Sequence, residues 1–168
     1  MRLDKIPGHH PQGPFWQGFD WSWWYPLEDL VVPVRQLRLQ PDDEEKGFTR
    51  SKALYRLRVG RRRGLFYIGE TSISAQHRLR GHYRGMNRQR SRSTTQPMRR
   101  PLGLYKGLAQ VRRRGLVVYA SWTAVPSLSK SDRRGLEAEL IAAYRATMGR
   151  NPDYQWPGAD SDRDLGAW

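Results

Sequence analysis

Two tyrosines, an arginine, a histidine and a glutamate in this chain suit chemistry on a phosphodiester. The chain has no cysteine, so the candidate groups are Tyr, His and Arg side chains and a carboxylate that holds a metal ion. Arg78 and His82 are four residues apart and share one face of an expected helix. Arginine makes a permanently charged phosphate contact, and histidine exchanges a proton near neutral pH. On their own, such pairs are usually a solvated helix face.

Glu137 is the carboxylate best placed for such a site. Acidic residues are scarce in the middle of the chain, where Glu70 is alone among residues 51–130. Glu137 lies on the edge of the apolar stripe of the last expected helix, whereas Glu139 points to the other side. That stripe consists of Leu136, Leu140, Ile141 and Tyr144. A carboxylate on a core-facing edge either pairs with an arginine or ligates a metal.

A hairpin and a helix are expected to carry the tyrosines and the Arg–His pair. Apolar and basic residues alternate in the first strand, and glycines bound the turn. The expected strand, turn, strand and helix cover residues 52–59, 60–64, 65–69 and 72–84. Thr71 or Ser72 is the expected cap of that helix.

The second half of the core is expected to add two helices and a strand. The polar stretch 86–100 has no periodicity and predicts a loop. The helix, strand and helix that follow are expected over 102–114, 116–125 and 135–147, with Gly115 and Gly149 as helix ends and Ser131 or Asp132 as the last cap. The order β-β-α-α-β-α predicts an α+β fold, in which helices flank a small central antiparallel sheet of three strands.

The region before the core is rich in Pro, Gly and aromatic residues. Its first 27 residues predict an irregular arm, and its tryptophans are too apolar for a free linker. This arm either wraps the core and buries its rings, or forms a dimer contact or a base-stacking surface. Residues 28–40 alternate apolar and polar positions and favour a strand, and 41–47 predict an exposed loop.

The composition limits the class of protein. A length of 168 residues suits one domain with a real core, and the lack of cysteine excludes a disulfide scaffold and a cysteine-based zinc site. No apolar run approaches the ~20 residues that a membrane span needs. The first ten residues have no apolar segment typical of a secretory signal. We therefore expect a cytoplasmic protein without a membrane partner.

The positive charge is concentrated in the middle of the chain. The formal net charge is +14, yet residues 51–130 alone carry +18, whereas residues 1–50 and 131–168 each carry −2. Such a block favours nucleic acid as the partner, and an anionic membrane surface comes second.

The ordered motifs of residues 51–152 resemble those of the GIY-YIG nuclease superfamily. Tyr67-Ile68-Gly69 matches the second signature triplet in full, whereas Ala53-Leu54-Tyr55 keeps only the tyrosine of the first. The later matches are Arg78 and His82 in QHRLRGHY, Glu137 in LEAELI, and Asn151 before Pro152. The resemblance divides the chain into an N-terminal extension (1–50), a nuclease core (51–152) and a C-terminal tail (153–168).

The resemblance implies a metal-dependent DNA endonuclease and a role for each matched residue. Tyr55 would be the general base or would orient the attacking water, and Glu137 would hold one Mg²⁺ or Mn²⁺ per active site. Arg78 and Tyr67 would bind the scissile phosphate, and His82 would assist proton movement. Asn151 would position rather than react. The expected products carry 5′-phosphate and 3′-hydroxyl ends.

The partner implied is double-stranded DNA. Arginines and polar side chains near the proposed site suit phosphate and base contacts, and the loop 86–100 is expected either to insert into the duplex or to touch phosphates alone. The residues expected to contact DNA are Arg61, Arg62, Arg63, Arg80, Arg84, Asn87, Arg88, Gln89, Arg90, Arg92, Arg99 and Arg100. A core without a separate reading module resembles a type II restriction enzyme, for which a homodimer is expected, built through the Trp-rich region.

Other functions fit the same residues. Without the motif order, Tyr55 and Tyr67 are packed rings and Glu137 is a salt-bridge partner. A nuclease without sequence specificity (a toxin, repair or recombination enzyme) shares the core motifs. An inactive member of the superfamily, or a basic module that binds structured RNA, keeps the charge without the catalysis.

Overall fold

A four-stranded antiparallel sheet forms the centre of the computed structural model, which describes residues 10–44, 46–60, 64–91 and 102–155. The strand order across the sheet is β3-β6-β4-β5. These strands are β3 (Tyr25–Pro26), β4 (Ala53–Val59), β5 (Tyr67–Thr71) and β6 (Val118–Ala124). The prediction of a three-stranded sheet was therefore one strand short. The fourth strand comes from the N-terminal extension, where Tyr25 pairs with Ala120 on the outer edge of β6.

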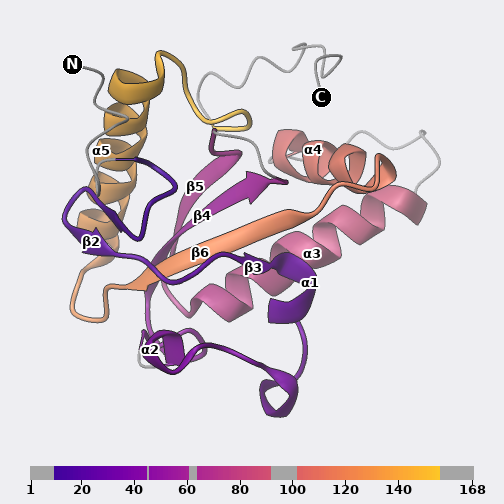
Figure 1. Cartoon of the computed structure of the whole chain (residues 1–168), viewed down its shortest axis with the longest axis horizontal. Helices are drawn as coiled ribbons and strands as arrows, with labels where there is room; N and C mark the ends of the chain where they lie inside the picture. The colour runs from indigo at the N-terminus through magenta and orange to yellow at the C-terminus, as the bar shows by residue number, and fades with distance from the viewer. Residues whose placement is uncertain (1–9, 45, 61–63, 92–101, 156–168) are drawn as a thin grey trace.

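Three long helices flank the sheet in the predicted order, and the α+β class is confirmed. They are α3 (Ala75–Ser91), α4 (Leu102–Arg113) and α5 (Lys130–Met148). Figure 1 shows α3 and α4 on one side of the sheet and α5 on the other. Within the described residues, the longest helices are too polar or too short to cross a bilayer.

The boundaries of two helices differ from the sequence-based expectation. Ser74 caps α3 by accepting the backbone N–H of His77, whereas Thr71 Oγ1 accepts the N–H of Ile73. Ser129, not Ser131 or Asp132, caps α5, because it accepts the N–H of Asp132 and the Asp132 carboxylate returns the bond. This capping box satisfies two N–H groups of the first turn at once.

Helix α3 also runs further than predicted. Residues 86–91, expected to open a polar loop, form its last turns. Met86 is buried in the core, and this single apolar anchor extends the helix beyond the segment that shows apolar periodicity. The rest of the expected loop lies outside the described residues.

The N-terminal extension contains short helices where a strand and a loop were predicted. Residues 28–40 hold part of α1 (Leu27–Leu30) and a 3-10 helix (Val34–Gln36) instead of a strand. Leu27 and Leu30 are buried three residues apart, which is helical spacing, and Pro33 donates no hydrogen bond to a sheet.

The acidic stretch 41–47 is not simply an exposed loop. It begins with α2 (Pro41–Glu44), and Asp43 is fully buried. The Asp43 carboxylate accepts the Tyr25 hydroxyl at 2.6 Å and the Trp23 N–H at 3.1 Å. Burial, followed by the hydrogen bond to this carboxylate, raises the pKa of Tyr25 to about 12. Asp43 thus fastens α2 to the start of β3.

The described part of the Trp-rich arm, residues 10–27, packs two of its tryptophan rings against the core. It forms a tight hairpin of β1 (Phe15–Trp16) and β2 (Phe19–Asp20), with Gln17 and Gly18 at positive φ in the turn. Trp16 and Trp21 are buried, whereas Trp23 keeps 70% of its surface exposed. The arm lies beside α5 (Figure 1).

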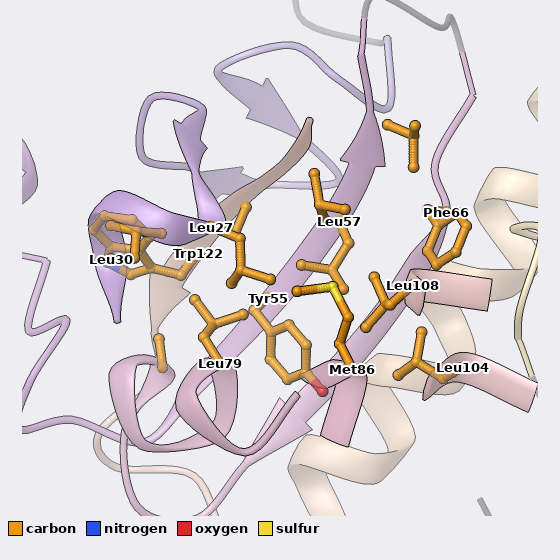
Figure 2. Packing of buried hydrophobic residues seen from close by; sticks show 14 of the residues in the cluster. Leu27, Leu30, Tyr55, Leu57, Phe66, Leu79, Met86, Leu104, Leu108 and Trp122 are labelled. Atoms are coloured by element: carbon orange, nitrogen blue, oxygen red, sulfur yellow. The ribbon is translucent and has the colours of Figure 1, made fainter. Parts of the chain in front are cut away.

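Two hydrophobic clusters lie on opposite faces of the sheet because successive β4 residues point to opposite sides. Ala53, Tyr55, Leu57 and Val59 face α3 and α4, as Figure 2 shows for Tyr55 and Leu57 among Leu79, Met86 and Leu108. Leu54 faces the arm and α5, where it joins a cluster with Trp16, Trp21, Ile68, Leu140 and Tyr144.

The first residues of the predicted C-terminal tail belong to the folded core. The backbone N–H groups of Asp153 and Tyr154 donate to the carbonyls of Leu65 and Phe66, and the Tyr154 ring packs on Phe66. Gln155 is buried. Residues 156–168 lie outside the described part of the chain.

Candidate active site

The two motif tyrosines lie on the same face of the sheet through strand register. In the antiparallel pairing of β4 with β5, Tyr55 is opposite Gly69 and Leu57 is opposite Tyr67. Opposite residues share a face, so both tyrosine rings point toward α3, with centroids 6.1 Å apart. Tyr55 is fully buried and Tyr67 is half-buried.

Gly69 makes room for the Tyr55 side chain. A Cβ atom at position 69 would lie 2.4 Å from the Tyr55 hydroxyl oxygen and 2.8 Å from a ring carbon of Tyr67. No side chain fits at such distances. The YIG triplet therefore needs glycine here because of the close approach of the two tyrosines. The backbone conformation does not require glycine, since the φ angle of Gly69 lies outside the positive range.

Helix α3 brings Arg78 and His82 to the Tyr55 hydroxyl. His82 Nε2 lies 2.7 Å from that oxygen, and Arg78 Nε donates to it across 3.4 Å. The spacing of four residues places both side chains on one face of α3, as the sequence predicted. Because Arg78 only donates, the Tyr55 oxygen accepts at least one hydrogen bond. If Nε2 carries the imidazole proton, the oxygen receives two donors.

His82 is neutral at physiological pH. It is 1% exposed, and burial followed by the nearby Arg78 charge lowers its pKa to about 3. Its Nδ1 atom is buried and has no hydrogen-bond partner among the described residues. Buried polar atoms without partners are rare in structural positions.

Tyr55 is also neutral in this structure. Burial raises its pKa well above the usual value, and the neighbouring Tyr67 raises it further, whereas Arg78 acts in the opposite direction. The pKa of Tyr67 is also raised by burial and by Glu137, while a hydrogen bond with Tyr55 lowers it. Ionisation of either tyrosine to the phenolate requires a bound cation or an additional hydrogen-bond donor beside its oxygen, because both stabilise the negative charge.

Glu137 reaches this cluster from the other face of the sheet. Strand β5 is an edge strand, so alternate N–H groups point away from β4. The side chain of Gln155 accepts the N–H of Ile68 at 2.9 Å, and Glu137 accepts the N–H of Glu70. Side chains from both faces of the sheet therefore come together at the edge of β5.

The Glu137 carboxylate is poorly solvated and close to a second carboxylate. Burial and then the charge of Glu70 raise its pKa to about 7, although Arg78 acts in the opposite direction. Glu70 has a partner of its own, because the fully buried Arg133 donates to it at 2.9 Å. Arg133 precedes Glu137 by one turn of α5. Glu137 forms no salt bridge among the described residues, although the charges of Arg78 and Arg134 both lower its pKa.

These residues fit a hydrated divalent cation. No group of three or more His, Asp or Glu side chains gathers in a metal-binding arrangement within the described ranges. Mg²⁺, however, keeps several waters and is commonly held by one or two carboxylates plus substrate phosphate. A desolvated carboxylate whose pKa is about 7 gains most from such a cation. Glu137 would hold the ion.

Asn151 is not brought to this cluster. It follows the αL residue Gly149 that ends α5, and its Oδ1 accepts the Arg145 guanidinium at 2.7 Å. Glu137 and Gly149 are twelve residues apart, or roughly 18 Å along a helix axis. Among the described residues, no contact joins Asn151 to Tyr55, His82 or Glu137.

The residues predicted to contact DNA have different structural roles. Arg84 and Arg88 are exposed on α3, whereas Arg80 donates to the Val32 carbonyl at 2.7 Å and ties the N-terminal segment to α3. Arg112 donates to Asn87 and lies over the Tyr83 ring. The backbone of Gln89 and Arg90 belongs to the last turns of α3. The others lie outside the described residues: Arg61, Arg62, Arg63, Arg92, Arg99 and Arg100.

A shallow hollow lies on the other edge of α3. It has a volume of about 230 Å³ and is lined by Val31, Pro33, Arg80, Tyr83 and Arg84. Arg78 and His82 point to the opposite edge of the helix, so this hollow is separate from the tyrosine cluster.

Three residues near the cluster had no recognisable signal in the sequence. Tyr105 of α4 has its ring centroid 5.9 Å from that of His82. Gln155 lies in the predicted tail, and Arg133 was one of many arginines. The one signal that could have indicated Arg133 is its spacing of four residues before Glu137, which puts both on one helix face.

Comparisons of the chain with protein-family models, with curated proteins and with solved structures found no match.

Proposed function

We propose that this protein is a metal-dependent endonuclease that hydrolyses double-stranded DNA, with a core of the GIY-YIG type. One observation carries the proposal: five polar side chains from β4, β5, α3 and α5 lie around the free edge of β5. They are Tyr55, Tyr67, Arg78, His82 and Glu137. Structural polar groups are normally paired, whereas in this set His82 Nδ1 has no partner among the described residues and the pKa of Glu137 is raised to about 7.

Each side chain has a separate task in phosphodiester hydrolysis. Arg78 binds a phosphate oxygen, since its guanidinium is exposed on one side and bonded to Tyr55 on the other. The Tyr55 oxygen takes a proton from the attacking water. The hydrogen bond to neutral His82 gives the Tyr55 proton an acceptor, so the tyrosine does not have to ionise first.

The bond changes balance as an ordinary hydrolysis. The water oxygen attacks phosphorus, and the bond from phosphorus to the 3′ oxygen breaks. The leaving oxygen takes up a proton from solvent, and the products carry 5′-phosphate and 3′-hydroxyl ends. A divalent cation held by Glu137, Mg²⁺ or Mn²⁺, supplies charge stabilisation when it is bound.

The proposal extends to DNA recognition and assembly. Arg84 and Arg88 are exposed on the helix that carries Arg78, and we assign them contacts with DNA phosphates outside the tyrosine cluster. Site-specific cutting of both strands calls for two copies of the chain, so we propose a cytoplasmic homodimer. Trp23 is more exposed than Phe15, the other exposed ring in the described part of the arm, and is the residue proposed to take part in the dimer contact.

A matched pair of glutamates on α5 tests the enzyme activity. Glu137→Gln should lower DNA cleavage about 1,000-fold in Mg²⁺ or Mn²⁺ while duplex binding is kept, because the carboxylate for the cation is lost. Glu139→Gln is the control, since Glu139 is exposed on another side of the same helix. Cleavage is followed on supercoiled plasmid, and binding by fluorescence anisotropy in Ca²⁺.

The outcomes separate the candidate functions. Discrete fragments from a phage genome support a site-specific enzyme, whereas a smear indicates a nuclease without sequence specificity. Wild-type protein that binds DNA but leaves plasmid intact in both metals contradicts the enzyme proposal and favours a binding module. For the dimer, light scattering should give twice the chain mass, and Trp23→Ser should shift it toward the monomer; a monomeric wild type contradicts this part.

A further inference from the structure

Tyr105 of α4 lies next to the candidate active site and has no role in the mechanism above. Its side chain is half-buried, and its ring centroid is 5.9 Å from the His82 ring, tilted by 59°. His82 in turn contacts both motif tyrosines, with ring centroids 5.5 Å and 6.0 Å away. Tyr105 therefore continues a cluster of aromatic rings from β4 and β5 onto α4.

Gly85 holds the Tyr105 ring in this place. A Cβ atom on Gly85 would lie 2.6 to 2.8 Å from three ring carbons of Tyr105. Glycine inside a helix costs about 1 kcal/mol relative to alanine, yet it lets α3 and α4 approach until the ring rests on the α3 backbone. The ring thus has its position fixed by Gly85 on one side and by His82 on another.

The Tyr105 side chain lies near the charged part of the site. Its ring contacts His82, and its charge raises the pKa values of both Tyr67 and Arg78, the two groups assigned to phosphate binding. Within the described ranges, no hydrogen bond satisfies the Tyr105 hydroxyl. A phenol held rigidly and left without a partner suits a ligand oxygen.

We propose that Tyr105 contacts the substrate: its hydroxyl donates a hydrogen bond to a nonbridging oxygen of the DNA phosphate that Arg78 binds. This inference rests on the proposed function, because it takes a phosphodiester anion as the ligand. The donor is neutral and the acceptor is charged, which gives a bond stronger than a neutral pair. The ring comes from α4, whereas the glycine and the arginine come from α3, so only the folded chain builds this contact.

The main test removes only the hydroxyl. Tyr105→Phe should raise KM for a short duplex about tenfold, the effect expected for a hydrogen bond to a charged acceptor, with kcat within about twofold of wild type. Its melting temperature should equal that of wild type, because the hydroxyl has no internal partner to lose. A purely structural role for Tyr105 would leave KM unchanged.

A second pair of variants moves the ring instead. Gly85→Ala should displace Tyr105 and raise KM to a similar degree, and adding Tyr105→Phe to it should bring little further change, because both act on one contact. Gly81→Ala is the control on the same helix, since a Cβ there meets no atom within 4 Å. It should leave KM unchanged.

The results distinguish this inference from the proposed function. If the wild type cleaves DNA and Tyr105→Phe has wild-type KM, the substrate contact is refuted and the nuclease stands. If the wild type neither binds nor cleaves duplex DNA, both are refuted. Should Gly85→Ala fail to fold, Tyr105→Phe alone decides.

Discussion

Tyr55 and Arg56 are adjacent residues of β4 and bury their polar groups on opposite faces of the sheet. The two groups differ in how fully they are hydrogen-bonded. Both side chains have no exposed surface. Around Tyr55 the polar contacts are incomplete: one donor is 3.4 Å away, and the histidine bonded to it has an orphan nitrogen. Around Arg56 each guanidinium nitrogen has a hydrogen-bond partner, although the neighbouring Arg58 Nε and Trp16 Nε1 have none among the described residues.

Arg56 is a buried cation with no carboxylate partner in the described part of the chain. Its guanidinium donates to the carbonyls of Pro11 and Gly13 and to Ser121 Oγ. The rings of Trp21 and Trp24 lie on either side of it at 4.4 and 4.7 Å. Arg58 continues the stack, between Trp24 and Tyr119. Cation–π contacts and backbone carbonyls here replace an ion pair.

The contrast separates two uses of buried polarity. A fully paired group such as Arg56 holds the arm on the sheet and has no capacity left for a ligand. In the cluster around Tyr55, His82 Nδ1 has no hydrogen-bond partner among the described residues, and the pKa of Glu137 is raised to about 7. Incomplete pairing costs stability, and it is the condition under which a site can bind a ligand. Changes on the two faces should therefore affect different measurements.

The largest effect is expected for Tyr55→Phe. Loss of the hydroxyl should lower kcat of DNA cleavage about 1,000-fold, within the range of general acid–base catalysis. The melting temperature should fall less than in Arg56→Met, although the buried His82 Nε2 loses its partner at 2.7 Å. A variant with wild-type activity would show that Tyr55 is a packed ring only.

Arg56→Met should show the reverse pattern. The uncharged chain leaves two carbonyls without donors and two tryptophans without their cation, and we expect a loss of about 3 kcal/mol in the free energy of unfolding. Urea denaturation measures it, and cleavage well below the melting temperature should stay within a few-fold of wild type. Equal stability of variant and wild type would mean that the arm is held without Arg56.

Gly69→Ala should affect both measurements, because the methyl group enters the space of the Tyr55 hydroxyl and the Tyr67 ring. Overpacking of this kind should cost about 2 kcal/mol, and the displaced tyrosine should lower cleavage at the same time. Gly81→Ala again serves as the matched control. Unchanged activity in Gly69→Ala would contradict the position assigned to Tyr55.

Glu137→Gln should change the stability of folding less than Arg56→Met does, and the size of its effect depends on pH. The folded-state pKa of Glu137 is raised to about 7, so folding favours the protonated acid and wild-type stability falls as pH rises from 4.5 to 7. The uncharged glutamine avoids this loss, so the variant should be about 1–2 kcal/mol more stable at pH 8 and equal to wild type at pH 4. Thermal melts across pH measure the difference. Mg²⁺ should stabilise only the wild type at pH 8.

The core elements could be predicted from the sequence because their signals are local. Alternation in β4, the charge-free β6 and the glycine after α5 each report a backbone preference of a few neighbouring residues. The same reasoning failed at residues 28–40 and 41–47. Burial of Leu30 and Asp43 against distant parts of the chain overrides the local pattern there.

The site was predictable in part for the same reason. The four-residue spacing placed Arg78 with His82, and the strand pattern placed Tyr55 and Tyr67 on strands of one hairpin. Asn151 matched a motif, yet the helix length carries it away from Glu137. Tyr105 had no motif, and only the packing of α4 on Gly85 brings it beside His82.

The sequence alone determined which side chains were available, which elements carry them, and that the positive charge is concentrated in residues 51–130. Tertiary structure decided which of these groups meet. Glu137 and Tyr55 lie on opposite faces of one sheet and approach only because β5 is its edge. Of the arginines near this sheet, the fold buries Arg56 as an anchor and leaves Arg78 exposed. Burial and neighbouring charge are properties of the folded chain, because they depend on residues far apart in sequence.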